Sequence, residues 1–207
     1  MQQQEPGVRL IGIVHETNVS SLHFESNNCI MSFQPFFDRE SHAMSYKAAP
    51  LPFKPSRLNG LSQRLVASHY ENNYGGALRR LNAIERQLAG LDSASAPNFL
   101  VNGLGREQLI AANSVLLHEV YFECLGGDGE LSSDLDAALA RDFGSVARWC
   151  AGFVAMAKAL AGGSGWALLS WSPRLGRLVS QWAADHTHCL AEGQVILALD
   201  MYEHAYH

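Results

Sequence analysis

Apolar residues recur at steps of three and four along two stretches of the chain, at residues 61–88 and 106–125. This spacing places them on one face of a helix, so both stretches are predicted to be amphipathic helices. Residues 72–76 interrupt the first stretch with two glycines, each of which costs about 1 kcal/mol in a helix relative to alanine. We therefore expect a kink, a break or a site of close packing there.

Turn signals divide the next part of the chain. Residues 126–129, Gly-Gly-Asp-Gly, end the second helix, and either Ser132 or Ser133 is suited to cap the next one. Gly144 and Ser145 then mark the start of a further helix that runs to about Leu160. This part of the chain is predicted to be helical.

The hydrophobic pattern changes after residues 162–165, Gly-Gly-Ser-Gly. Residues 166–171 and 178–182 are short, largely apolar segments with tryptophans, and a turn with Pro173 and Gly176 separates them, which predicts a β-hairpin. Residues 195–199 are a third, fully apolar strand candidate that leads directly to Asp200. Helices followed by a small three-stranded antiparallel sheet predict an α+β fold.

Differences in periodicity along the sequence also suggest how the chain is divided. Residues 1–43 lack sustained periodicity and are interpreted as a poorly structured extension or an upstream start that is not used, with translation beginning at Met44. Residues 44–92 are expected to form an N-terminal helical hairpin part. Residues 93–102 read as a linker that opens the C-terminal α/β part, residues 93–207.

Composition and charge exclude several classes of function. The chain has 47% hydrophobic and 17% charged residues and a formal net charge of −5, with no basic face for nucleic acid. Its four cysteines are scattered without C-x-x-C spacing, which is typical of reduced cytoplasmic thiols. No apolar run approaches a bilayer span and no export signal is present, so we expect a cytoplasmic protein without a membrane anchor.

Three histidines and one aspartate stand where the predicted helices and sheet would meet. His69 lies on the first helix, His118 lies inside the apolar stripe of the second, and Asp200 and His204 follow the third strand. Any one of these histidines alone is more typical of a hydrogen-bonded core or surface residue. Together, three imidazoles and a carboxylate suit Fe, Mn or Zn by ligand type.

The segment 200–206, Asp-Met-Tyr-Glu-His-Ala-Tyr, resembles the Asp-x-Trp-Glu-His-Ala-Tyr signature of the iron/manganese superoxide dismutases, with Tyr202 in the tryptophan position. Other blocks agree in order and spacing: Leu51-Pro52-Phe53, the helix with His69, His118 followed by Tyr121-Phe122, and Gly163-Ser164-Gly165-Trp166. The resemblance covers residues 50–207.

This resemblance implies a function and a metal site. His69, His118, Asp200 and His204 would bind one Fe or Mn ion per chain, with iron slightly favoured and a solvent molecule as the fifth ligand. The metal would cycle between two oxidation states and convert superoxide to oxygen and hydrogen peroxide. His186, with Asp185 before it, resembles the outer-sphere residue that the family places against that solvent. A strand histidine facing water would give the same pattern.

The resemblance also implies further site residues and a partner. Glu203 would reach the metal-ligand histidine of a second subunit in a homodimer, although a solvated carboxylate at a helix start is equally plausible from the local sequence. Trp166 and Trp182 would form apolar walls of the metal pocket, although both could equally be plain core aromatics without a function at the site.

The chain departs from the family pattern in two places. The family's His-x3-Tyr gate positions are occupied here by Asn73 and Ala77, with Tyr74 as a neighbouring replacement. The chain also ends at His207, where the family has tyrosine and continues through another long helix, so the C-terminal part is interpreted as truncated.

Three functions are weighed. The leading one is superoxide dismutation at a mononuclear Fe or Mn centre. The second is a non-catalytic metal-binding or redox-sensing relative that kept the ligands after losing the gate residues. The third is a non-haem iron oxygenase with two histidines and one carboxylate, which a third imidazole disfavours because it leaves too few open positions.

Overall fold

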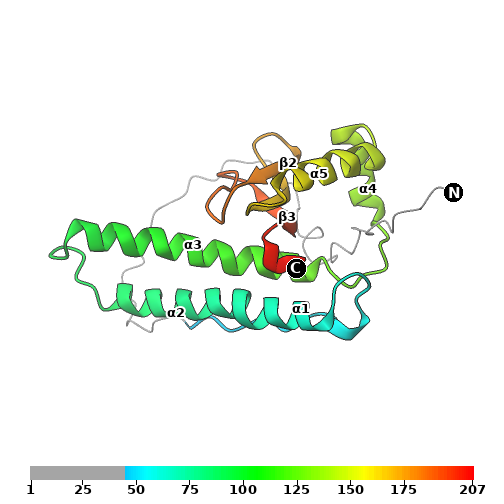
Figure 1. The fold of residues 1–207 in the computed structure, drawn as a ribbon. Helices are drawn as coiled ribbons and strands as arrows, with labels where there is room; N and C mark the ends of the chain where they lie inside the picture. Colours follow the sequence, from blue (N-terminus) through cyan, green and yellow to red (C-terminus); the bar gives the residue numbers. More distant parts are fainter. Residues whose placement is uncertain (1–44) are drawn as a thin grey trace.

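The computed structural model describes residues 45–207, in which a helical N-terminal region is followed by a three-stranded antiparallel sheet (Figure 1). This arrangement confirms the predicted α+β class. The expected extension, residues 1–43, lies outside the described residues. None of the helices in the described part is both long and apolar enough to cross a membrane.

A nearly continuous helical rod forms the first arm of the N-terminal region. After the short 3₁₀ helix η2 (Pro55–Arg57), the rod consists of α1 (Gln63–Ser68), the π-helical segment η3 (His69–Tyr74) and α2 (Gly75–Ala89). The hydroxyl of Ser62 caps α1 by accepting a hydrogen bond from the backbone N–H of Leu65 at 3.1 Å.

The π-helical segment η3 occupies the place where the sequence indicated a kink, a break or close packing. The backbone stays helical there, and a Cβ atom at Gly75 would lie 3.4 Å from the carbonyl oxygen of Tyr70. Segments of π-helix are rare and are frequently found at functional sites. Here the segment begins at His69, one of the expected ligands.

Helix α3 (Asn98–Glu123) lies beside α2 as the second arm of a hairpin (Figure 1). Helix α3 begins at Asn98 rather than near residue 106. Residues 98–102 of the expected linker therefore form the start of α3, and residues 93–97 lead into it. This second arm lies beyond residue 92, whereas the hairpin was expected within residues 44–92. The division of the chain at residue 92 stays a prediction.

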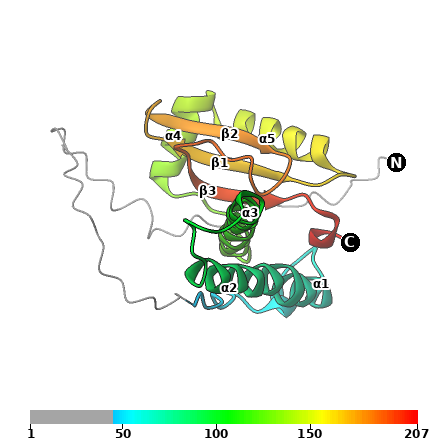
Figure 2. The ribbon, with the colours of Figure 1, turned by 90° about the vertical axis from the view of Figure 1, so that its left-hand side faces the viewer.

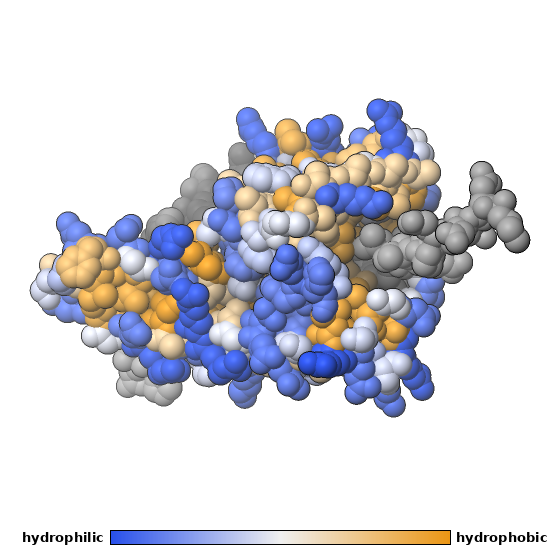
Figure 3. Space-filling model, viewed as in Figure 1, coloured by the Kyte–Doolittle hydropathy of each residue, from blue (hydrophilic) through white to orange (hydrophobic). Residues whose placement is uncertain are grey.

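The outer end of this hairpin carries exposed apolar side chains. Phe99 is 79% exposed, and Leu100 and Val101 beside it are also exposed. Figure 3 shows apolar residues gathered where α3 begins. The start of α3 therefore gains little from burial and was harder to recognise from hydrophobic periodicity.

Two shorter helices, α4 (Ser133–Phe143) and α5 (Val146–Leu160), precede the sheet. Ser132, one of the two expected caps, accepts a hydrogen bond from the N–H of Leu135, and Ser145 caps α5 in the same way. Gly144 ends α4 with a φ of 88°, a left-handed conformation that glycine adopts without strain.

The sheet consists of β1 (Trp166–Ser172), β2 (Arg177–Ala183) and β3 (Gln194–Asp200), in the order β2-β1-β3. Both pairings are antiparallel. Because successive side chains in a strand point to opposite faces, each strand contributes to two different cores.

Each face of the sheet packs against a different set of helices. Trp166 and Leu168 belong to the core formed with α2 and α3, whereas Ala167 and Leu169 belong to the core formed with α4 and α5. Figure 2 shows α3 on one side of the sheet and α4 and α5 on the other. The central strand β1 is consequently buried on both faces.

Gly165, directly before β1, explains part of the Gly-Ser-Gly-Trp motif. Its φ is 137°, and a Cβ atom there would collide with the carbonyl oxygen of Ala183. The carbonyl oxygen of Gly165 also accepts a hydrogen bond from the N–H of Met201 at 3.0 Å. The glycine thus allows the ends of the three strands to close together beside Asp200.

Candidate metal centre

Separate elements deliver the four expected ligands to one place. His69 is the first residue of η3, and His118 lies near the C-terminal end of α3. Asp200 ends β3, and His204 lies in the following 3₁₀ helix η4 (Glu203–Ala205). Asp200 is paired with Trp166 of β1, so both side chains face α3 rather than α5.

The ligand atoms surround a common point. One oxygen of Asp200, Oδ2, lies 3.1 Å from Nε2 of His69, 3.7 Å from Nε2 of His118 and 3.4 Å from Nε2 of His204. All four ligand atoms lie within 4.8 Å of one another. Atoms bonded to one ion at about 2.1 Å are separated by about 3 to 4 Å, depending on the bond angle. The spacing therefore fits a single mononuclear ion.

Burial makes this arrangement costly without a shared cation. His69, His118 and Asp200 are almost completely buried. The Nε2 atoms of the three imidazoles and Oδ2 of Asp200 are buried and have no hydrogen-bond partner. Unpaired buried polar atoms are rare in folded proteins and call for an explanation. An Fe, Mn or Zn ion would satisfy all four, and this donor set suits each of those metals.

The remaining polar atoms of two ligands are held by the backbone. Nδ1 of His118 donates to the carbonyl oxygen of Ser114 at 2.6 Å, and this bond leaves Nε2 unprotonated in the neutral ring. Oδ1 of Asp200 accepts a hydrogen bond from the N–H of Tyr202 at 2.8 Å, which leaves Oδ2 directed at the imidazoles. Both ligands are thus oriented in advance.

The pKa values of two ligands favour a neutral His118 beside an anionic Asp200. Burial lowers the pKa of His118 to about 4, although Asp200 acts in the opposite direction. Burial acts to raise the pKa of Asp200, but the imidazoles of His204 and His69 close to its Oδ2 bring it down to about 2. Deprotonated ligands are the forms that bind a metal.

His186 lies beside the cluster. Its ring centroid is 6.2 Å from that of His118, and its Nδ1 accepts a hydrogen bond from Nε1–H of Trp166 at 2.9 Å. An indole nitrogen only donates, so Nδ1 is unprotonated and the neutral imidazole carries its proton on Nε2. Burial also lowers the pKa of His186, which keeps the ring neutral.

Trp166 occupies the position expected of a pocket wall. It is fully buried, and its ring meets the ring of His118 edge-on at a centroid distance of 5.2 Å. The same residue thus supplies apolar contact to a ligand and a hydrogen bond to His186.

Trp182 lies elsewhere, and its assignment to the pocket wall does not fit the structure. It is 53% exposed and is paired with Ala167, whose side chain belongs to the core under α4 and α5. Strand alternation places Trp182 on the opposite face of β2 from Ala183, which packs with Trp166. The sequence placed a tryptophan in the right strand but could not determine which face it occupies.

Asp185 also differs from the expected pairing with His186. Its Oδ1 accepts hydrogen bonds from the N–H of Thr187 at 2.7 Å, the hydroxyl of Thr187 at 2.6 Å and Nδ1 of His188 at 2.9 Å. The carboxylate therefore stabilises the turn that contains His186 rather than the ring of His186 itself.

Tyr74 does not replace the missing gate phenol. Its hydroxyl accepts a hydrogen bond from the N–H of Ala49 at 2.7 Å and donates one to Glu119 at 2.8 Å. Burial raises the pKa of this phenol to about 12. The ring contacts His118 at a centroid distance of 6.3 Å, so Tyr74 supports a ligand while its hydroxyl is engaged elsewhere.

Glu203 is exposed on the chain, next to His204, whose side chain is 31% exposed. The side chain of His204 is thus partly accessible, while its Nε2 atom is buried with the other ligand atoms.

Two contacts at the site were not anticipated from the sequence. The ring of Tyr202 is stacked against His186 and against His204, and the side chain of Asn113 donates to the carbonyl oxygen of His186 at 2.6 Å. Asn113 is 73 positions away from His186 along the chain, so no local pattern could indicate the contact. Tyr202 was noticeable only as a substitution within the signature.

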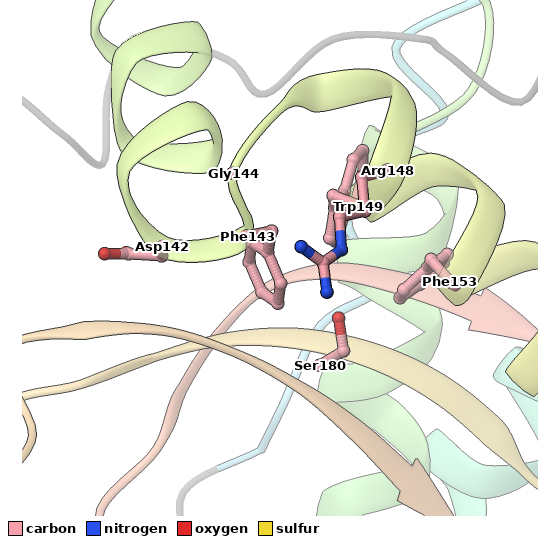
Figure 4. A pocket seen from close by; sticks show the side chains of 8 residues that line it. Asp142, Phe143, Gly144, Arg148, Trp149, Phe153 and Ser180 are labelled. Carbon is pink, nitrogen blue, oxygen red and sulfur yellow. The ribbon is translucent and has the colours of Figure 1, made fainter.

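A hollow of about 560 Å³ lies on the other face of the sheet, away from the ligands. Figure 4 shows it between the α4–α5 turn and β2, with Phe143, Arg148, Phe153 and Ser180 around it. It contains none of the unpaired ligand atoms. The chemistry therefore belongs to the small buried cluster rather than to this larger hollow.

Comparisons with known proteins agree with the geometry. Residues 131–207 match the family model described as "Iron/manganese superoxide dismutases, C-terminal domain". The "Superoxide dismutase [Fe]" of Cupriavidus metallidurans is 63% identical over 79% of this chain and 83% of its own length. That of Aquifex pyrophilus is 32% identical over 74% and 75%, and the "Superoxide dismutase [Mn] 2" of Haloferax volcanii is 29% identical over 79% and 82%. The chain belongs to the iron/manganese superoxide dismutase family.

Proposed function

We propose that this protein is a superoxide dismutase that converts two superoxide anions and two protons to oxygen and hydrogen peroxide. The observation that carries the proposal is the set of four unpaired, buried ligand atoms around one point. A bound Fe or Mn ion supplies the one-electron chemistry of both half-reactions. Family membership and the names of the relatives support this reaction.

One ion per chain is expected, and iron is slightly favoured over manganese. The relative at 63% identity is named for iron, whereas several relatives near 30% identity are named for manganese. The donor set itself suits both ions. Elemental analysis of protein purified from its native source tests this assignment.

The ligands contribute charge as well as binding. A single carboxylate, Asp200, among three neutral imidazoles lowers the net positive charge of the centre and so affects its redox potential. Its orientation is maintained by the N–H of Tyr202, and that of His118 by the carbonyl oxygen of Ser114. These bonds orient two of the four ligands in advance.

His186 is proposed to manage protons beside the metal. Since Trp166 donates to Nδ1, the proton of the neutral ring is held on Nε2, where it is available as a hydrogen-bond donor. A neutral donor is suited to an anionic substrate that must gain protons. In this assignment Trp166 maintains the tautomer and His186 presents the proton.

We further propose a homodimer in which Glu203 meets His204 of a second subunit. The exposure of Glu203 and the partial exposure of His204 support this contact. A cytoplasmic location is also proposed, because the three cysteines of the described part are free. Sedimentation of the metal-loaded protein and fractionation of the native cells test these two points.

A second candidate is a metal-binding or redox-sensing relative without turnover. It is favoured by one observation, that Asn73 and Ala77 stand at the gate positions while the hydroxyl of Tyr74 is engaged by Ala49 and Glu119. His204 adds a third imidazole to His69, His118 and Asp200 in one cluster, and this disfavours the oxygenase.

A dismutase assay of the iron- and manganese-loaded protein separates the two candidates. The leading proposal expects catalysis per bound ion far above that of the free aquo-metal, in a family whose members approach a diffusional ceiling of about 10⁸–10⁹ M⁻¹s⁻¹. Activity no greater than that of the aquo-metal at full metal content would favour the non-catalytic relative.

A further inference from the structure

The position of His186 is not determined by the sheet. His186 lies in the turn that follows β2, three residues after the last paired residue, Ala183. The hydrogen bond from Trp166 determines which nitrogen carries the proton, but a single hydrogen bond leaves the ring free to tilt about that contact. Other contacts must set its distance from the ligands.

The ring of Tyr202 contacts both His186 and the ligand His204. It stacks on His186 with a centroid distance of 5.2 Å and an interplanar angle of 18°, and on His204 at 5.4 Å and 18°. The ring of Tyr202 is therefore nearly parallel to each of the two imidazoles and adjoins both. The backbone of Tyr202 is anchored as well, because its N–H donates to Oδ1 of Asp200.

Trp166 limits the movement of the stack from a third side. Its ring lies 6.2 Å from that of Tyr202 at an angle of 63° and 5.7 Å from that of His186. The ring of Tyr202 therefore contacts both His186 and His204 and restricts the position of His186 relative to that ligand. A smaller or non-planar side chain at position 202 would allow His186 to move toward the ligand or away from it.

Asn113, on helix α3, holds the backbone of His186. Its Nδ2 donates to the carbonyl oxygen of His186 at 2.6 Å. Asn113 precedes Ser114, whose own carbonyl oxygen accepts from Nδ1 of the ligand His118. One turn of α3 therefore sets both the orientation of a ligand and the position of the turn that contains His186.

We propose that Asn113 and Tyr202 are positioning residues that hold His186 at a defined place beside the metal ligands, Asn113 through its backbone and Tyr202 through its ring. The inference rests on the proposed function of His186 as the proton-holding residue. It assigns a role to the tyrosine that stands in the tryptophan position of the family signature, and that role belongs to the ring rather than to the phenol.

Two pairs of variants test the proposal in the metal-loaded protein. Tyr202→Phe keeps the ring and is expected to retain activity, whereas Tyr202→Leu removes the stack and is expected to lower kcat about tenfold, part of the 10²–10⁴-fold effect of a positioned proton donor. Asn113→Asp replaces the donor by a carboxylate that repels the carbonyl of His186, with the same expected loss, and Asn113→Gln is the conservative rescue.

Two readouts separate positioning from general damage. Long-range ¹⁵N NMR of the metal-free protein is expected to show His186 protonated on Nε2 in the native chain and in Tyr202→Phe, and a mixture of tautomers in Asn113→Asp and Tyr202→Leu. The pH profile of kcat in the metal-loaded variants is expected to shift in the same direction as in His186→Ala, at unchanged metal content.

A double-mutant cycle distinguishes this inference from the proposed function. If His186→Ala leaves the pH profile and kcat unchanged, the role of His186 itself fails. If His186→Ala is impaired but Asn113→Asp and Tyr202→Leu behave like the native chain, only the positioning role fails. Additive losses in His186→Ala combined with Tyr202→Leu would also overturn it, because residues that act through one another are not additive. If Tyr202→Leu loses metal or does not fold, Asn113→Asp, which touches no ligand side chain, decides the outcome.

Discussion

The two faces of the central strand β1 bury different kinds of side chain, with polar ligands on one face and apolar residues on the other. On one face, Trp166 lies beside His118 and Asp200, whose buried ligand atoms have no hydrogen-bond partner. On the other face, Ala167 and Leu169 pack with apolar side chains of α4 and α5. The first face depends on a bound ion to compensate its buried polar atoms, and the second is an apolar core that supports it from behind. Variants on each face should therefore fail in different ways.

The largest effect is expected from loss of a ligand. His118→Ala should abolish stoichiometric binding of metal, because a buried cluster with one ligand fewer leaves the ion undercoordinated and Asp200 poorly compensated. Metal content per chain after dialysis measures this. His188→Ala, an exposed histidine outside the cluster, is the matched control and should bind normally. One tightly bound ion per chain in His118→Ala would show that the ligand set is wrong.

A cavity on the opposite face should reduce stability and leave the ligands intact. Leu169 is fully buried in the core under α4 and α5, so Leu169→Ala is expected to lower the free energy of unfolding by about 2–5 kcal/mol. Urea denaturation of the metal-free protein measures this loss. The same change at Leu175, which is 58% exposed, should cost far less. Loss of metal from folded Leu169→Ala would contradict the separation of the two faces.

The two buried tryptophans allow a matched comparison of an indole N–H on each face. Nε1–H of Trp166 donates to His186, whereas the Nε1 atom of Trp149 has no hydrogen-bond partner in the described part of the chain. Trp166→Phe should lower kcat about tenfold near neutral pH, because the proton of His186 is no longer confined to Nε2. Trp149→Phe should leave kcat unchanged. Equal effects of the two changes on kcat would remove the proposed role of Trp166.

A smaller effect is expected at Asp142, which links α4 to β2. Arg141 holds the pKa of this carboxyl below its ordinary value against the opposing effect of burial, and the N–H of Leu178 donates to it at 2.8 Å. A carboxyl whose pKa is lowered in the folded state stabilises the protein at pH values above its ordinary pKa. This stabilisation is lost as the pH falls through the folded pKa. Asp142→Asn should therefore cost about 1 kcal/mol near neutral pH. The difference from the native chain in thermal unfolding should shrink as the pH falls below the ordinary carboxyl pKa and through the lowered folded value, and a difference that stays constant over that range would exclude the charge as its cause.

The smallest effect is expected at Trp182. Because this residue is exposed on the face away from the ligands, Trp182→Ala should change stability by no more than about 0.5 kcal/mol and leave kcat and metal content unchanged. Steady-state kinetics and metal analysis check this. A loss of activity comparable with that of Trp166→Phe would restore Trp182 to the pocket wall.

The sequence by itself determined the α+β class and the candidate ligands, because both depend on local signals. Hydrophobic period, capping serines and glycine turns act over a few residues, so the capping serine before α4 and all three strands could be recognised. The signature around Asp200 and His204 is likewise contiguous. The first turns of α3 were missed because they are exposed and lack the apolar stripe of a buried helix.

Only the tertiary structure decided which side chains meet. The face of β2 that Trp182 occupies depends on register with β1, and a shift of one residue would reverse it. The contact from Asn113 to His186 joins elements far apart in sequence, and the stack of Tyr202 on two imidazoles depends on how η4 folds back beside Asp200. The residue types at the site are a property of the chain, whereas the orientation of each ring and the place of each proton come from packing.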